Sequence, residues 1–214
     1  MGLFDWMFGR RTRLPRTTVW IDEASRLRGL ERAVRDDLAS GRSVVLVAHF
    51  ASALVEVGKQ LAEADIAFRT LRAWQPLPAS PTVVAILAKA LPQPTPGEPP
   101  KVVARGKPQV IVRGVELHVL EQENARLLQF ADGLSVPTEV SCSVSLEGPL
   151  FAMVGNQWLA PMLQSMGMGS DESIDSPMVA RSLAKVQRKL EKRARRDLPA
   201  DSLAEWILRN VDPK

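Results

Sequence analysis

The chain of 214 residues has one cysteine, two histidines and no tyrosine. A single cysteine forms neither a disulfide framework nor a thiolate metal cluster. Cys142 lies in an alternating apolar run, so we expect a small buried side chain and not a reactive thiol. His49 and His118 lie at predicted strand ends without an acidic or thiol partner at ligand spacing. The two rings could meet across adjacent strands, but we interpret them as structural and expect no metal site.

Long apolar runs are also missing. The longest, 43–58, contains His49 and Glu56 and is shorter than the about 20 residues that span a bilayer. No basic region is followed by a long apolar core and a small-residue cleavage site, as in a secretory signal. We therefore expect a cytoplasmic protein, soluble or bound peripherally to the inner face of the cell membrane.

What the chain does contain is enough apolar sequence for a substantial core. Its apolar content of 45% excludes general disorder, and its length suits one compact domain with extensions. The chain has 28 lysine and arginine residues against 24 aspartate and glutamate residues, and the sequence pI is about 9.6. Anionic partners, including acidic lipid and nucleic acid, are therefore under consideration.

The periodicity of the first half predicts a βαβ unit. Residues 44–47 form a continuous apolar run that is typical of a buried parallel strand. Apolar residues then recur at helical spacing from Leu54 to Ala64, and 66–71 is a further strand candidate. Elsewhere we predict helices over 20–40, 177–196 and 200–210, strands over 101–104 and 110–120, and a proline-rich insertion over 91–101.

Residues 144–193 carry the most informative motifs. The segment begins with a strand containing Ser145, Leu146, Glu147 and Leu150, and continues through Met166, Gly167 and Met168. It then enters a long helix that contains Met178, Val179, Arg181, Gln187, Lys189 and Glu191. These positions resemble the second motor half of the SecA preprotein translocase family, where the strand reads S-L-E-D-x-L and the helix opens M-V-x-R-A-I. A weaker resemblance covers 38–71.

The resemblance implies a fold class and a division of the chain. It implies an α/β fold with a RecA-like, helicase-type parallel sheet, flanking helices and a C-terminal helical extension. The expected parts are an amphipathic basic segment over 1–16, the α/β domain over 17–155 with its insertion at 91–101, and the helical extension over 156–214.

The catalytic motifs of such a motor are absent from the sequence. There is no G-x-x-x-x-G-K-[ST] loop and no Asp-Glu pair at the end of an apolar strand. After Leu117, His118 and Val119, the family's Q-x-x-G-R-x-G-R motif is reduced to Gln129 and Gly133, with Arg126 as the only arginine. Since one transition-state arginine contributes about 10³ to 10⁵ in rate, we expect no independent ATP hydrolysis. We expect no cofactor; ATP or ADP as a silent structural ligand is the alternative.

The first residues have the composition of a membrane anchor. Apolar side chains precede a cluster of arginines, and the expected membrane-binding residues are Leu3, Phe4, Trp6, Phe8, Arg10, Arg11 and Arg13. Such side chains enter the headgroup region while the arginines meet anionic lipid. The alternative, which the residues leave open, is that the aromatic side chains pack on the domain itself.

The helix expected over 177–196 has two different faces. Val179, Leu183, Val186 and Leu190 form a narrow apolar stripe. The remaining surface is basic, and the expected partner-binding residues are Arg181, Lys185, Arg188, Lys189, Lys192 and Arg193. This surface is either a solvated helix face or a dock for acidic lipid, nucleic acid or an acidic protein. No aromatic residue that would stack on bases is interleaved, which disfavours nucleic acid.

Three functions follow from these observations. We favour a non-catalytic interaction or accessory protein at the cytoplasmic membrane face, linked to protein translocation, whose partner is a Sec component, a client or another ATPase. The first alternative is a half-motor that completes an ATPase site in trans, with Arg126 or Arg69 as the phosphate arginine. The second alternative is a nucleic-acid-binding domain derived from a helicase.

Overall fold

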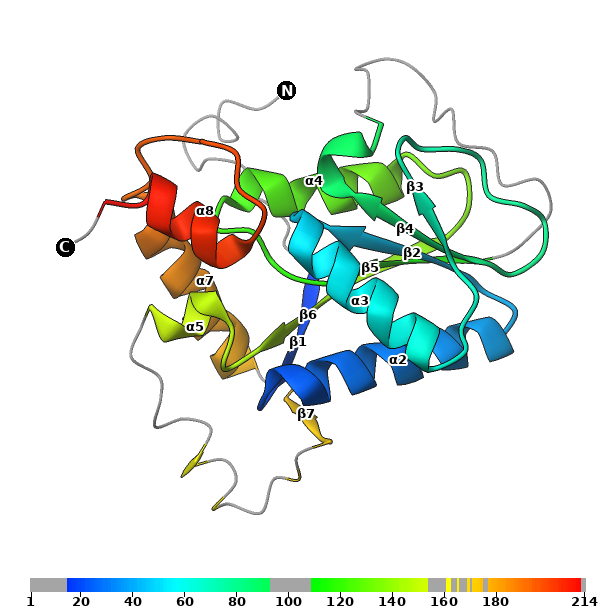
Figure 1. Cartoon of the computed structure of the whole chain (residues 1–214), viewed down its shortest axis with the longest axis horizontal. Coiled ribbons are helices and arrows are strands. Elements are labelled where there is room, and N and C mark those ends of the chain that lie inside the picture. Colours follow the sequence, from blue (N-terminus) through cyan, green and yellow to red (C-terminus); the bar gives the residue numbers. More distant parts are fainter. Residues whose placement is uncertain are drawn as a thin grey trace, which may run out of the picture.

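The computed structural model describes residues 15–92, 109–153, 161–162, 165, 169, 171–174 and 177–212. Its centre is a seven-stranded sheet in the order β3-β4-β2-β5-β6-β1-β7 (Figure 1). Every neighbouring pair is parallel except β1 and β7, which are antiparallel. The strands are β1 (Arg16–Trp20), β2 (Ser43–Ala48), β3 (Arg69–Leu71), β4 (Val83–Leu87), β5 (Val110–Gly114), β6 (Thr138–Ser145) and β7 (Ser173–Ile174).

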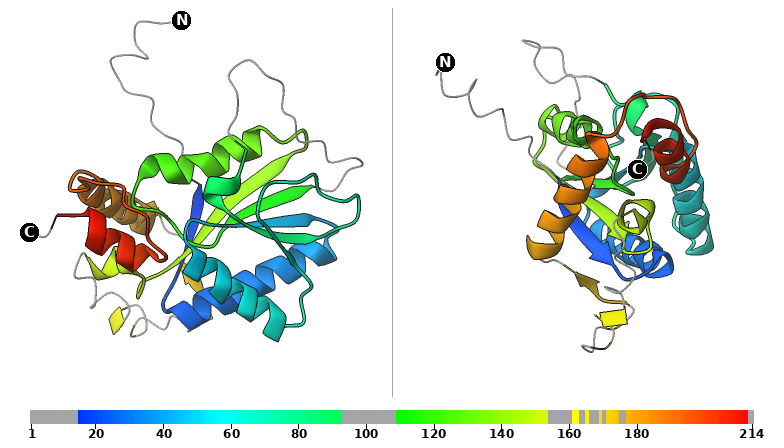
Figure 2. Two further views of the ribbon diagram at one scale, coloured as in Figure 1. Left: turned by 45° about the horizontal axis from the view of Figure 1, so that its top comes forward. Right: turned by 90° about the vertical axis from the view of Figure 1, so that its left-hand side faces the viewer.

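Helices cover both faces of the sheet (Figure 2). Helices α2 (Glu23–Ala39) and α3 (Ala51–Glu63) pack on one face, and α4 (Glu121–Asp132) packs on the other. The side chains of strand β2 point alternately to the two faces of the sheet. Because helices cover both faces, the strand is buried along its whole length. Val44 and Leu46 join the cluster under α2 and α3, whereas Val45 and Val47 join the cluster under α4.

The short η1 (Ala88–Ala90) follows β4 and contacts α4. The remaining helices, α5 (Pro149–Ala152), α7 (Pro177–Glu191) and α8 (Leu203–Asn210), gather at one end of the sheet. Figure 1 shows α5, α7 and α8 beside one another, next to the carboxyl end of β6. An antiparallel bridge between Ala194 and Val211 closes the chain after α8 back onto the end of α7. The α/β class, the mostly parallel sheet, the flanking helices and the helical extension are thus confirmed.

The start of the first helix is a correction to the sequence analysis. We predicted a helix from residue 20, but Trp20 ends strand β1 and α2 begins at Glu23. Asp22 caps the helix, because its carboxylate accepts the backbone N–H of Ser25 at 2.6 Å. The polar residues Arg16 to Thr18 concealed the strand, whose side chains become buried only at Val19 and Trp20.

Two other predicted strands are shorter than the apolar pattern suggested. The strand predicted over 110–120 ends at Gly114, where a Cβ atom would overlap the Sγ atom of Cys142 on β6. The strand predicted over 66–71 is limited to Arg69–Leu71 at the sheet edge. The helix predicted to continue to residue 196 ends at Glu191. The strand predicted over 101–104 and most of the proline-rich insertion lie outside the described residues.

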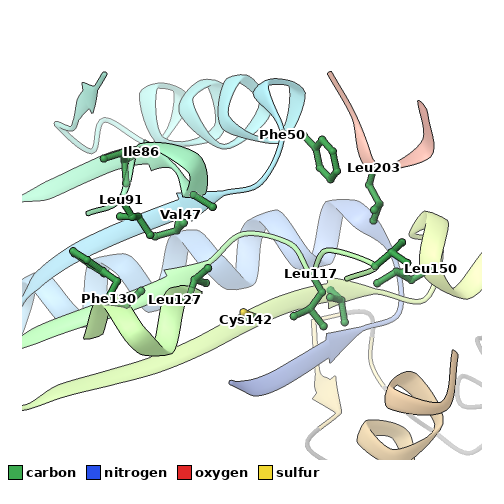
Figure 3. Close-up of a cluster of buried hydrophobic side chains, with 14 of the residues drawn as sticks. Val47, Phe50, Ile86, Leu91, Leu117, Leu127, Phe130, Cys142, Leu150 and Leu203 are labelled. Atoms are coloured by element: carbon green, nitrogen blue, oxygen red, sulfur yellow. The ribbon is translucent and has the colours of Figure 1, made fainter. Parts of the chain in front are cut away.

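Cys142 is buried in β6, as expected, within the cluster that includes Leu117, Leu127 and Phe130 (Figure 3). Burial raises the pKa of its thiol to about 12, so the thiolate that would react is scarcely populated near neutral pH. Within the described part of the chain, no helix is both long and apolar enough to cross a membrane.

Candidate functional site

A pocket of about 290 Å³ lies where β2, β5 and β6 end. From β2 the chain builds β3 and β4 on one side, and then crosses to build β5 and β6 on the other. This change of direction is a topological switch point, where open α/β sheets bind their ligands outside the carboxyl ends of the strands. The first turn of α3, the start of α8 and α5 complete the wall of the pocket.

The carboxyl group of Glu116, two residues after β5, accepts hydrogen bonds from the backbone just before α3. Its Oε1 atom accepts the backbone N–H of His49 at 3.1 Å and that of Phe50 at 3.0 Å. The backbone N–H of Ser52, in the first turn of α3, also has a partner, since it donates to the carbonyl oxygen of Asp201 at 3.0 Å. Burial raises the pKa of the Glu116 carboxyl to about 7, although both backbone N–H groups act in the opposite direction.

Arg26 of α2 forms the second part of the site. Its side chain is only 4% exposed and donates to the carbonyl oxygen of Val115, to Glu23 and, at 3.1 Å, to Glu56. Glu23 in turn accepts the hydroxyl of Ser145, at the end of β6, at 2.7 Å. Burial, followed by repulsion from Glu23, raises the pKa of Glu56. The pocket therefore presents three carboxyl groups and one guanidinium, and it carries a negative balance when all are ionised.

His49, which follows β2, and His118, which follows β5, lie against each other. Their ring centroids are 5.3 Å apart, and the His118 ring also packs on Phe50 and Trp206. The Nδ1 atom of His118 accepts the N–H of Leu120 at 3.0 Å. Burial lowers the pKa of His49 to about 3 and that of His118 to about 4, so both rings are neutral at physiological pH. Their contacts are those of structural side chains that hold α8 against the sheet.

The predicted partner-binding residues lie on α7 and just beyond its end. The apolar residues Leu183, Val186 and Leu190 are buried against the rest of the domain. On the opposite side, residues at positions i, i+4, i+7, i+8 and i+11 share a stripe of about 100°. This stripe is exposed, and we call it the basic face: Arg181, Lys185, Arg188, Lys189 and Lys192.

Arg193 does not belong to the basic face. It is half-buried, and it donates to the backbone carbonyl of Asp212. Arg181 has a partner in the structure. Among the described residues, the side chains of Lys185, Arg188, Lys189 and Lys192 make no hydrogen bond or ion pair. The predicted membrane-binding residues, from Leu3 to Arg13, lie outside the described residues.

Neither arginine of the half-motor alternative lines the pocket. Arg126 on α4 pairs with Glu123 one turn earlier, at 3.1 Å, and Arg69 is exposed on the edge strand β3. The charged residues that line the pocket were not predicted as site residues. Glu116 lay inside the strand predicted over 110–120, and it stands at a strand end only because β5 stops at Gly114.

Comparison with known proteins gives a limited likeness. No family model matches the chain. Over 82 residues it is 34% identical to the protein translocase subunit SecA of Symbiobacterium thermophilum. That stretch is 38% of this chain and 9% of the SecA subunit, so the chain spans less than a tenth of that relative. The SecA resemblance of the sequence is therefore found again over a part of the chain.

Two solved structures are similar in arrangement. One is the C-terminal domain of a protein described as a possible DNA helicase from Lactobacillus plantarum WCFS1, with a TM-score of 0.43 and 12% identity over 64% of this chain and 78% of that one. The other is the C-terminal part of the Fun30 ATPase domain, with a TM-score of 0.42 and 10% identity over 77% of this chain and 54% of that one.

Proposed function

We propose that the chain is a non-catalytic, SecA-like interaction module that binds an anionic membrane surface through the basic face of α7. The observation that carries this proposal is the set of exposed cations, four of which have no partner among the described residues. Because the apolar stripe of α7 is already buried, the helix has no free apolar face to insert into lipid. Its binding would therefore be electrostatic, at about 1 kcal/mol for each basic residue near an anionic surface.

The site at the strand ends supports a role without nucleotide chemistry. Phosphate groups bind where helix amides and cations converge. Here the carboxylate of Glu116 occupies the amides that open α3, and Glu23 and Glu56 surround Arg26. Such a pocket repels phosphates. This adds to the absence of a phosphate-binding loop from the sequence.

The similarity to SecA supports placing the module in protein translocation. In this proposal it works at the cytoplasmic membrane face, and its protein partner is a translocation component, a client or another ATPase. The basic residues 10–13 of the sequence would add a second contact with anionic lipid.

Vesicle binding tests the proposal directly. The full chain is sedimented with vesicles of phosphatidylglycerol and phosphatidylcholine, or of phosphatidylcholine alone. We expect binding only to the anionic vesicles, weakening as salt rises. Changing Lys185, Arg188, Lys189 and Lys192 together to Gln should weaken binding about tenfold or more.

The matched control removes the same charge elsewhere. Its four exposed substitutions to Gln are at Lys59, Arg69, Arg72 and Lys89. This control should keep most of the binding, and an equal loss in both variants would argue against a specific basic face. Deleting residues 1–13 should weaken the binding further if the start of the chain is also an anchor. Tighter binding of a single-stranded oligonucleotide than of vesicles would favour the nucleic-acid alternative.

A further inference from the structure

The pocket at the strand ends holds a half-buried carboxylate, that of Glu116, which has no cation bound directly to it among the described residues. The hydrogen bonds of the Arg26 guanidinium go to Glu23, Glu56 and the carbonyl oxygen of Val115. Glu116 forms no salt bridge within the described residues, although it lies near enough for Arg26 to lower its pKa. A carboxylate that is partly removed from water without an ion-pair partner is costly, and it either takes up a proton or attracts a cation.

One oxygen of Glu116 is free for such a cation. Oε1 accepts the two backbone N–H groups at the start of α3. In the part of the chain that the structure describes, no group donates to Oε2. This atom is not fully buried, and Glu116 lines the pocket. A carboxylate has room for further donors on its second oxygen.

The rest of the wall is largely apolar. Leu117, Val144, Leu150, Phe151 and Leu203 surround the carboxyl groups. Figure 3 shows Leu117, Leu150 and Leu203 arriving from three separate elements, the segment after β5, α5 and α8. A volume of about 290 Å³ is enough for a small organic molecule, but not for a folded partner.

We propose that this pocket binds a small organic cation, an ammonium group carried on an apolar body. The ammonium would donate to Oε2 of Glu116, and the negative balance of Glu23 and Glu56 against Arg26 would favour it over a neutral or anionic molecule. The apolar body would lie against Leu150 and Phe151. This site is separate from the basic face of α7, so it does not depend on the proposed membrane function.

Three probes that share one body test the charge selectivity. They are 2-phenylethylammonium, the neutral 2-phenylethanol and the anionic 3-phenylpropionate, each titrated into the full chain at pH 8 and followed by amide chemical shifts in NMR. We expect the cation to bind about tenfold or more tightly than the alcohol, which corresponds to one good charged contact. The anion should be the weakest of the three.

Two variants connect the selectivity with the pocket. Glu116→Gln keeps an oxygen for the two backbone N–H groups but removes the charge, so the cation and the alcohol should then bind within about threefold of each other. Glu56→Gln, at the more exposed rim, should lose part of the preference while it keeps the fold. The control is Glu63→Gln, on α3 but outside the pocket, which should behave as the unchanged chain.

The proposal is overturned if none of the probes binds, if the alcohol binds as tightly as the cation, or if the preference survives Glu116→Gln. Vesicle binding of Glu116→Gln should equal that of the unchanged chain. The two proposals can therefore fail separately.

Discussion

The indole ring of Trp20 lies directly against the Cα atom of Gly29, so closely that a Cβ atom on Gly29 would overlap the ring. This contact joins the last residue of β1 to the middle of α2. It explains why a residue with poor helix propensity stands inside a helix of 17 residues.

The substitution Gly29→Ala should therefore destabilise the domain. Overpacking costs about 1 to 3 kcal/mol, and the better helix propensity of alanine returns about 1 kcal/mol. We expect a net loss of up to about 2 kcal/mol in the free energy of unfolding, measured by urea denaturation. Gly58→Ala in α3 is the control: its nearest neighbour is the tip of the Phe68 ring, at 3.2 Å, which has room to move. A gain at position 29 would contradict the contact.

The buried histidine pair predicts a loss of stability in acid. His49 and His118 have folded-state pKa values of about 3 and about 4, below the unfolded value of 6.5. The unfolded chain therefore binds more protons below pH 6.5, and stability falls as the pH drops from 6.5 towards 4. The slope is up to about 1.4 kcal/mol per pH unit for each ring. Ring proton shifts in NMR should stay constant down to about pH 5, and titration near 6.5 would refute the burial.

Glu116 contributes with the opposite sign. Its folded-state pKa of about 7 lies above the unfolded value of 4.5, so its contribution to stability is complete below pH 4.5 and is lost as the pH rises through 7. The Glu116→Gln variant lacks this loss. Its free energy of unfolding, relative to the unchanged chain, should rise between pH 5 and pH 8 by up to about 1.4 kcal/mol per unit. A difference that is independent of pH would mean that Glu116 titrates normally.

A fully buried carboxylate, that of Asp37 on α2, lies between Arg42, which precedes β2, and Arg113 of β5. Asp37 is 1% exposed and pairs with Arg42 at 2.8 Å and with Arg113 at 2.6 Å. Because Asp37→Asn leaves two cations without their counter-charge, we expect a loss of about 3 kcal/mol in the free energy of unfolding. Glu63→Gln, which breaks the exposed pair with Lys59, should change it by less than about 0.5 kcal/mol. Thermal unfolding of the two variants side by side would separate them.

The elements that could be predicted from the sequence are those whose pattern is local. The run Val44 to Val47 gave β2 because a strand between two helical layers is apolar on both faces. The two faces of α7 followed in the same way from spacing along one helix. In contrast, β1 depends on pairing with β6, more than a hundred residues away, and its polar first half carries no strand pattern.

The pocket could not be predicted for the same reason. Arg26, Glu56 and Glu116 come from α2, α3 and the end of β5, and only the parallel sheet brings them together. Each residue alone is an ordinary charged side chain in a chain with 24 acidic and 28 basic residues. The end of β5 beside a switch point would mark Glu116, but the apolar pattern placed that end at residue 120, and the strand order is known only from the structure.

The position of β1 also has a consequence for how the protein is made. The strand is synthesised before the other strands of the sheet, yet among the described residues it pairs only with β6 and β7. During synthesis it has no sheet partner until residue 145 has left the ribosome, while β2 to β5 can already pair with one another. Closing so long a loop slows folding and leaves an unpaired strand edge available to other chains. Completion of the sheet in a nascent chain therefore waits for β6 and then recruits the earliest of the described strands.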